Sequence, residues 1–173
     1  MLKGEKVLLR SVEPEDADLI FEWENNRDIW HVSNTVKPFS RAMIKAYAES
    51  DQDVYAQRQL RLIIQHKETN KEMGCVDLYD FDPTHDRAGV GILIADKKYR
   101  NKGFASEAVS LIIDYAFFTL NLHQLHCAIL TDNTDSLKLF QKHGFQVIGE
   151  KEDWIKEGTQ FKNEFTLQLI NRT

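Results

Sequence analysis

The segment from Ala88 to Ala105 changes character three times, and it constrains the fold more than any other part of the chain. Gly89–Ala95 is apolar and predicts a buried strand, Asp96–Arg100 is charged and predicts a loop, and a helical pattern begins directly afterwards. The first turn of a helix exposes unpaired N–H groups at the positive end of the helix dipole. Gly103 has no side chain that would keep an anion away from them. The segment therefore predicts a site for a phosphate or pyrophosphate group.

The spacing within this loop separates it from two other phosphate-binding loops. From Arg100 to Ala105 it reads R-x-x-G-x-A, whereas dinucleotide-binding loops read G-x-G-x-x-G and nucleoside-triphosphate loops read G-x-x-x-x-G-K-[ST]. It resembles instead the [R/Q]-x-x-G-x-[G/A] loop with which the GCN5-related N-acetyltransferase (GNAT) family binds the pyrophosphate of acyl-coenzyme A (acyl-CoA). Arg100 and Lys102 add positive charge at this predicted site.

A second segment, Asn133–Phe145, resembles the same family independently. It reads N-x-x-S-x-x-x-F-x-K-x-G-F, similar to the family pattern N-x-x-[SA]-x-x-x-[YF]-x-[KR]-x-G-F. The likeness then extends over almost the whole chain, because Leu8–Arg10 and Trp23–Asn26 resemble branches that acetylate protein N-termini, ribosomal proteins or spermidine. The chain is therefore identified as a member of the GNAT family.

Hydrophobic periodicity predicts the element order β, α, α, β, β, β, α, β, α, β, β. The expected strands are Lys6–Arg10, Leu60–His66, Met73–Tyr79, Ala88–Ala95, Leu125–Leu130, Phe145–Gly149 and Phe161–Ile170. The expected helices begin near Glu13, Ser40, Ala105 and Ser136. The resemblance implies an α/β (α+β) fold, a single GNAT domain over residues 1–173. Its mixed, mostly antiparallel sheet would have about seven strands, helices on both faces and a splay between strands four and five.

The composition describes an ordinary globular protein. Of the 173 residues, 42% are apolar and 28% are charged, and no stretch approaches 18 consecutive apolar residues. The start of the chain lacks the apolar segment of an export signal, so we expect a cytoplasmic protein without a membrane partner. A net charge of −5 argues against a nucleic-acid partner and mildly favours a cationic substrate.

The cysteines and histidines do not indicate a metal site. Cys75 and Cys127 lie in apolar, strand-like runs without ligand spacing, which predicts buried, reduced thiols. His123 and His126 have no third ligand close by in the sequence, so we expect no bound metal.

The resemblance implies acetyl-CoA as the acetyl donor. The backbone of Ile92–Ile94 would pair with the pantetheine arm as an additional strand and polarise the acetyl carbonyl. The glycine loop would hold the pyrophosphate, and Asn133 would contact pantetheine or adenosine, cap a helix, or do both. The residues expected to bind acetyl-CoA lie in the two motifs and the preceding strand: Ile92, Leu93, Ile94, Arg100, Asn101, Lys102, Gly103, Phe104, Ala105, Asn133, Ser136, Phe140 and Lys142.

The chain departs from the family pattern at two catalytic positions. Many relatives have a tyrosine acid where this chain has Phe140, and a glutamate where it has Gly89. We therefore take Asp77, which could relay a proton through water, and Tyr115 as the catalytic candidates. Tyr79 is a further candidate for the acid, although inward-facing tyrosines often serve only as core residues.

The expected acceptor is a small or exposed primary amine. The loop Arg27–Phe39 is long for a simple connection, so its Trp30 and His31 are candidate substrate residues, together with Asp80 and Asp82. Clustered carboxylates suit a polyamine, whereas a protein or peptide N-terminus needs an extended groove. Such acids can also be ordinary solvated turn residues. The final strands offer one route to a homodimer.

These observations predict an acetyl-CoA-dependent N-acetyltransferase in which a primary amine attacks the thioester directly. Two alternatives stay open. The chain could bind acyl-CoA without transferring the acyl group, which the residues at the two altered positions motivate. It could also be an α/β protein that has no CoA site.

Overall fold

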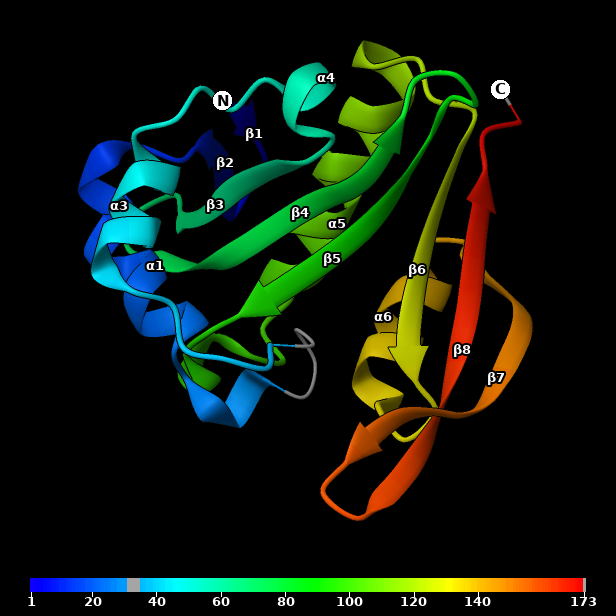
Figure 1. Ribbon diagram of the computed structural model, residues 1–173. Coiled ribbons are helices and arrows are strands. Elements are labelled where there is room, and N and C mark those ends of the chain that lie inside the picture. The colour runs from blue at the N-terminus through cyan, green and yellow to red at the C-terminus, as the bar shows by residue number, and fades with distance from the viewer. Residues whose placement is uncertain (31–34, 173) are drawn as a thin grey trace.

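Figure 1 shows the computed structural model, which describes residues 1–30 and 35–172. Eight strands form one mixed sheet in the order β1-β2-β3-β4-β5-β6-β8-β7. They are β1 (Leu2–Lys3), β2 (Val7–Ser11), β3 (Leu60–His66), β4 (Glu72–Asp82), β5 (Arg87–Ile94), β6 (Gln124–Leu130), β7 (Gln146–Glu157) and β8 (Gln160–Ile170). Every neighbouring pair is antiparallel except β5 and β6, which are parallel.

Helices connect these strands. The α-helices are α1 (Ala17–Glu24), α3 (Arg41–Ala48), α4 (Val54–Gln57), α5 (Phe104–Asp114) and α6 (Thr134–Lys142). Short 3₁₀ turns are η1 (Pro14–Asp16), η2 (Arg27–Ile29) and η3 (Lys97–Tyr99), and the π-helical turn η4 (Tyr115–Thr119) follows α5. No helix among these residues is long and apolar enough to span a membrane.

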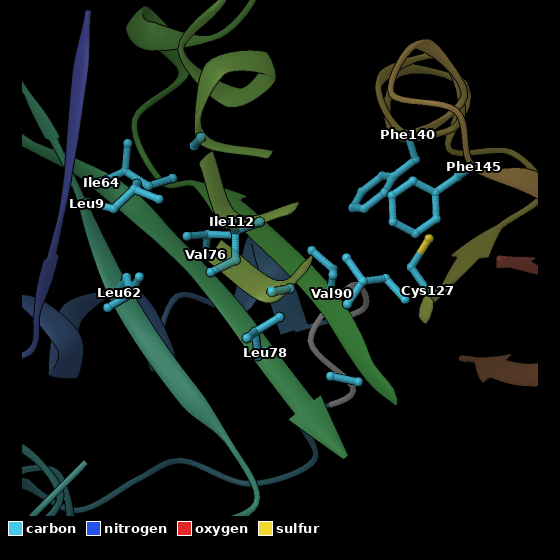
Figure 2. Close-up of a cluster of buried hydrophobic side chains, with 14 of the residues drawn as sticks. Leu9, Leu62, Ile64, Val76, Leu78, Val90, Ile112, Cys127, Phe140 and Phe145 are labelled. Atoms are coloured by element: carbon cyan, nitrogen blue, oxygen red, sulfur yellow. The ribbon is translucent and has the colours of Figure 1, made fainter. Parts of the chain in front are cut away.

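Helices cover both faces of the sheet, as the sequence predicts. Successive side chains of a strand point to opposite faces. In β3, Leu62 and Ile64 therefore join the main core with α5, whereas Ile63 joins a smaller cluster with α1 and α3. Figure 2 shows Ile112 of α5 beside Val76 of β4 in the main core. Cys75 and Cys127 are both buried and unpaired, which confirms the prediction for the thiols.

The sheet divides between β5 and β6. The two strands pair only at Arg87–Gly89 and Gln124–His126. Beyond Gly89, β5 stays paired with β4, while β6 stays paired with β8 to its end. In Figure 1 the two strands lie together near the top and diverge downward. This is the predicted splay between the fourth and fifth expected strands.

Three expectations about the elements need correction. The sheet has eight strands because Leu2–Lys3 pairs with β2, and two residues are too few to show a periodicity. Strand β7 extends to Glu157 instead of Gly149; it is mostly exposed and bulged, so it lacks the alternation that marks a half-buried strand. The helix expected to begin near Ala105 is not α-helical throughout: α5 ends at Asp114 and the chain continues as the π-helical turn η4.

Gly74 gives the first testable prediction, because β4 and β5 approach each other closely there. A Cβ at Gly74 would overlap the backbone carbonyl oxygen of Leu93. Gly74→Ala should therefore destabilise the protein by about 1–3 kcal/mol in urea unfolding. Gly149→Ala is the matched control, since nothing lies within 4 Å of its Cβ position. Equal midpoints for the two variants would contradict this packing.

Candidate active site

A cavity of about 460 Å³ lies where β5 and β6 separate. The residues around it come from α1, β3, β4, β5, β6, α6, the α1–α3 connection and the β7–β8 hairpin. Sequence-predicted residues that line it are Asp77, Ile92, Leu93, Asn133, Ser136 and Phe140. The strand that precedes the glycine loop and the second motif therefore contribute to one cavity, whereas residues 100–105 of the glycine loop do not line it.

The glycine loop lies at the end of β5. Arg100 donates from Nε (3.2 Å) and from its terminal guanidinium nitrogen (3.1 Å) to the carbonyl of Ile94, which ties the loop to that strand. Asn101 (φ 58°) and Gly103 (φ 87°) adopt left-handed backbone conformations before α5 begins. Gly103 is the N-cap of α5 and Phe104 anchors the first turn in the main core. The unpaired N–H groups in the first turn of α5 therefore point toward this loop.

Basic and polar side chains gather around the start of α5. Lys142 of α6 donates to the hydroxyl of Ser106 (3.1 Å), and His143 Nε2 lies 3.0 Å from the same oxygen, so these contacts join α5 to α6. The ammonium of Lys6 lies 3.5 Å from the position of a Cβ on Gly103. Sequence reasoning missed Lys6 because nothing in the residues around it indicates proximity to a loop nearly 100 residues later in the chain.

An ion-paired group forms another wall of the cavity. The guanidinium of Arg61 makes two hydrogen bonds of 2.8 Å with the two carboxylate oxygens of Asp77 and another with Glu24. Burial tends to lower the pKa of Arg61, but the anionic groups around it outweigh burial and raise that pKa above its ordinary value. Arg61 is therefore a permanent cation between two carboxylates.

Sequence reasoning missed Arg61 and Glu24 as site residues, although a charged residue inside the apolar run Leu60–Ile64 was an available signal. It also missed Glu164, a buried carboxylate that lines the cavity and pairs with Lys151 at 2.9 Å. The cavity walls thus carry the carboxylates of Glu24, Asp77 and Glu164 against the single guanidinium of Arg61.

Tyr79 explains why position 89 is a glycine. A Cβ at Gly89 would overlap the Tyr79 ring, and a Cβ at Gly91 would lie 3.8 Å from it. The ring meets His126 of β6 edge-on, with centroids 5.8 Å apart. Tyr79 thus extends from β4 across β5 toward β6, through the space in which a glutamate at position 89 would stand. Burial, reinforced by neighbouring negative groups, raises the pKa of its phenol, which therefore keeps its proton.

Phe140 belongs to both the core and the cavity. Its side chain is 3% exposed and packs edge-on against Phe145, with centroids 5.1 Å apart. Figure 2 shows both rings beside Cys127 of β6. Phe140 also lines the cavity, so the residue borders both the core and the open space.

The other predicted site residues do not line the cavity. Tyr115 begins η4 and packs against the main core. Asp80 is exposed, and Asp82 pairs with Arg87, in the region where β5 and β6 are still joined. Trp30 directly follows the cavity residue Ile29, and its indole donates a 2.8 Å hydrogen bond to the carbonyl of Glu24. His31 lies outside the described residues.

Comparisons with known proteins agree with this fold. A family model described as the acetyltransferase (GNAT) domain matches residues 6–146. An N-acetyltransferase named p20 from Bacillus licheniformis is 30% identical, with 99% of this chain and 96% of that protein covered. The spermidine N(1)-acetyltransferase of Escherichia coli K12 is 28% identical, with 98% and 89% covered.

Solved structures share the fold. The spermidine N-acetyltransferase of Vibrio cholerae, crystallised with CoA and spermine, has a TM-score of 0.84 and 21% identity, with 96% of both chains covered. An acetyltransferase of the GNAT family from Bacillus anthracis has a TM-score of 0.79 and 21% identity, with 98% and 97% covered.

The family match defines an acyltransferase. The chain belongs to the GNAT acetyltransferase family and is an acetyl-CoA-dependent N-acetyltransferase of amines, as predicted. Acetyl-CoA is the acetyl donor in this family.

The ion-paired group generates the second prediction. Arg61→Gln leaves two carboxylates facing each other without a cation, so the free energy of unfolding should fall by about 3 kcal/mol. Lys45→Gln, which removes a partner from an exposed pair with Glu49, should cost less than about 0.5 kcal/mol. Chemical denaturation measures both. A cost for Arg61→Gln as small as that of the control would show that the group is only a surface contact.

Proposed function

We propose that the acceptor is a primary amine, which enters as its ammonium and is held beside Asp77 and Glu24. The excess of carboxylates around the cavity is the observation that carries this proposal. Asp77 pairs with Gly91 in the register of β4 and β5, so its carboxylate lies beside the strand at which the thioester would be held. Relatives that are named spermidine N-acetyltransferases support a polyamine as the first acceptor to test, and a peptide N-terminus is the alternative.

We also propose how the chain holds acetyl-CoA. Beyond Gly89 the β6-facing edge of β5 has no partner strand among the described residues, so Ile92, Leu93 and Ile94 can pair with pantetheine. The space beside Gly103 can accept an anion, because the Lys6 ammonium, 3.5 Å away, is the group that lies within 4 Å of a Cβ placed there. The remaining residues assigned to the donor are Arg100, Asn101, Lys102, Phe104, Ala105, Asn133, Ser136, Phe140 and Lys142, with Lys6 added.

Acetyl-CoA supplies a thioester whose carbonyl carbon a neutral amine attacks directly. The chain must therefore take a proton from the ammonium. Both carboxylate oxygens of Asp77 already accept hydrogen bonds from Arg61. We therefore assign Asp77 an indirect role: its charge holds the ammonium, and a water molecule carries the ammonium proton away. Tyr115 packs against the main core, so this proposal leaves it out.

The phenylalanine at position 140 slows the reaction without preventing it. A thiol with a pKa near ~8.5 leaves readily as a thiolate at neutral pH. General acid catalysis contributes roughly 10²–10⁴-fold, which sets the largest loss to expect. The wild-type protein should therefore turn over measurably.

A panel of acceptors tests the proposal most broadly. Spermidine, free amino acids, amino sugars and N-terminal peptides are incubated with acetyl-CoA, and products are identified by mass spectrometry. Acetylation of an amine supports the proposal. Acetylation of only thiols or hydroxyls would overturn the assignment of the acceptor. Tight acetyl-CoA binding without any transfer would leave the alternative, a module that only binds acyl-CoA.

The glycine loop gives a prediction for donor binding. Gly103→Glu should abolish the heat of acetyl-CoA binding in calorimetry, because its carboxylate fills the anion site and repels the pyrophosphate. Two controls separate charge from backbone strain. Gly103→Ala has the same left-handed strain without the charge, and its methyl group should weaken binding without abolishing it. Gly158→Glu puts both strain and charge in the β7–β8 turn and should leave binding unchanged. Undiminished binding by Gly103→Glu would refute the assignment.

Position 140 gives a prediction for the chemical step. Because Phe140 lines the cavity, Phe140→Tyr should raise the single-turnover rate, with an upper scale of roughly 10²–10⁴-fold. Phe145→Tyr is the matched control: its ring is equally buried but does not line the cavity, so it should lower only the melting temperature. The same lowered stability and unchanged rate in both variants would mean that position 140 is purely a core position.

We propose a homodimer through the final strands as the quaternary arrangement. The hairpin β7–β8 exposes Ile148, Trp154 and Phe161, and a structure of the Vibrio cholerae spermidine N-acetyltransferase is described as dodecameric. Light scattering of the purified protein tests this, and a monomer at micromolar concentration would contradict it.

A further inference from the structure

A second cavity, of about 380 Å³, lies between the sheet and the helices α1 and α3. This volume is within the range of small-molecule pockets. Five residues line both this cavity and the first one: Glu24, Phe39, Arg61, Asp77 and Tyr79. The ion-paired group of Glu24, Arg61 and Asp77 therefore forms the boundary between the two cavities.

The second cavity is apolar away from this boundary. Its remaining residues are Ile20, Met43, Ile44, Tyr47, Gln59, Leu60 and Leu78. None of them carries a charge. Burial raises the pKa of the Tyr47 phenol to about 12, so Tyr47 is also neutral at physiological pH. The cavity thus combines a charged end beside the first cavity with an apolar body.

The position of the second cavity is fixed by contacts at the end of α1. Asn25 accepts from the backbone N–H of Phe39 (2.9 Å) and donates to its carbonyl (3.2 Å). These bonds hold Phe39 against both cavities. Ile20 and Ile44 belong to the apolar cluster under α1 and α3, so the walls are supported by packed side chains.

We propose that the second cavity binds the apolar tail of the acceptor, so that the preferred acceptor is a monoamine with an aliphatic chain. Its ammonium lies at Glu24 and Asp77, and its chain extends into the second cavity. This inference rests on the proposed function and narrows its acceptor class.

Charge distribution favours such a monoamine over a polyamine. The second and third ammonium groups of a polyamine need carboxylates along their path, and the second cavity offers none beyond the shared group. Arg61 neutralises part of that group. An aliphatic chain, in contrast, loses unfavourable contact with water along the whole apolar wall.

A series of alkylamines tests the inference. Ethylamine, butylamine and hexylamine have nearly equal basicity, so differences in kcat/KM at one pH report on the tail. Each methylene that enters an apolar cavity should raise kcat/KM about two- to fourfold, mainly through KM. Hexylamine should also exceed spermidine. The intact protein is assayed with saturating acetyl-CoA, and mass spectrometry identifies each product.

A rim variant tests the location. Met43 is 51% exposed at the cavity, so Met43→Glu brings a carboxylate to the apolar wall without a buried charge. This variant should lower the ratio of kcat/KM for hexylamine to kcat/KM for ethylamine by at least about fivefold. It should also raise kcat/KM for spermidine. Ala46→Glu adds the same charge on an exposed position of the same helix and should change neither. Gln59→Glu, at another exposed position of the cavity, is a second variant with the effect of Met43→Glu.

The outcomes separate this inference from the proposed function. A rise along the alkylamine series that Met43→Glu abolishes supports the inference. Acetylation of ethylamine and hexylamine with equal kcat/KM, or a clear preference for spermidine, would overturn it and leave the proposed function intact. Failure to acetylate any amine, with acetyl-CoA bound, would overturn both.

Discussion

The separation of β5 from β6 after three residue pairs is the constraint on which the site depends. Each strand keeps one partner, β4 or β8, but the facing edges lose theirs. Unpaired backbone groups in a largely buried setting are costly, and an exposed strand edge is a ready template for another extended chain. The separation therefore creates a cavity and, on one of its walls, a row of groups that an extended ligand can pair with. The glycine loop lies at the end of the same strand, held by Arg100 on the Ile94 carbonyl.

Aromatic side chains occupy the positions at which the family pattern has catalytic residues. Tyr79 crosses β5 over Gly89, and Phe140 packs on Phe145 at the wall of the cavity. Both changes exchange an ionisable or polar group at the usual position for packing, and the carboxylates that line the cavity come from other positions, Glu24, Asp77 and Glu164. The proposed binding of a cationic amine and the proposed removal of its proton depend on the ion-paired group around Arg61.

Local periodicity predicted the order of most elements, and the two short motifs carried the resemblance to the GNAT family, which in turn implied the splay. The sequence did not predict Lys6 beside Gly103 or the contact of Arg61 with Glu24 and Asp77, since such contacts depend on how distant strands align. The length of β7 was also missed, because an exposed strand has no apolar face to reveal it. Tyr115 was chosen for its residue type alone; the structure places it in η4, packed against the core and outside the lining of the cavity.

Hydrogen–deuterium exchange with and without acetyl-CoA tests the central claim, that the divided sheet and the glycine loop together form the donor site. The account predicts that binding slows exchange at residues 90–94 of β5, at 102–106 around the start of α5, and at 133–137 around the start of α6. Exchange in β1 and β2 should not change beyond the neighbourhood of Lys6. Binding that protects none of these three segments, or protects only the β7–β8 hairpin, would contradict the account.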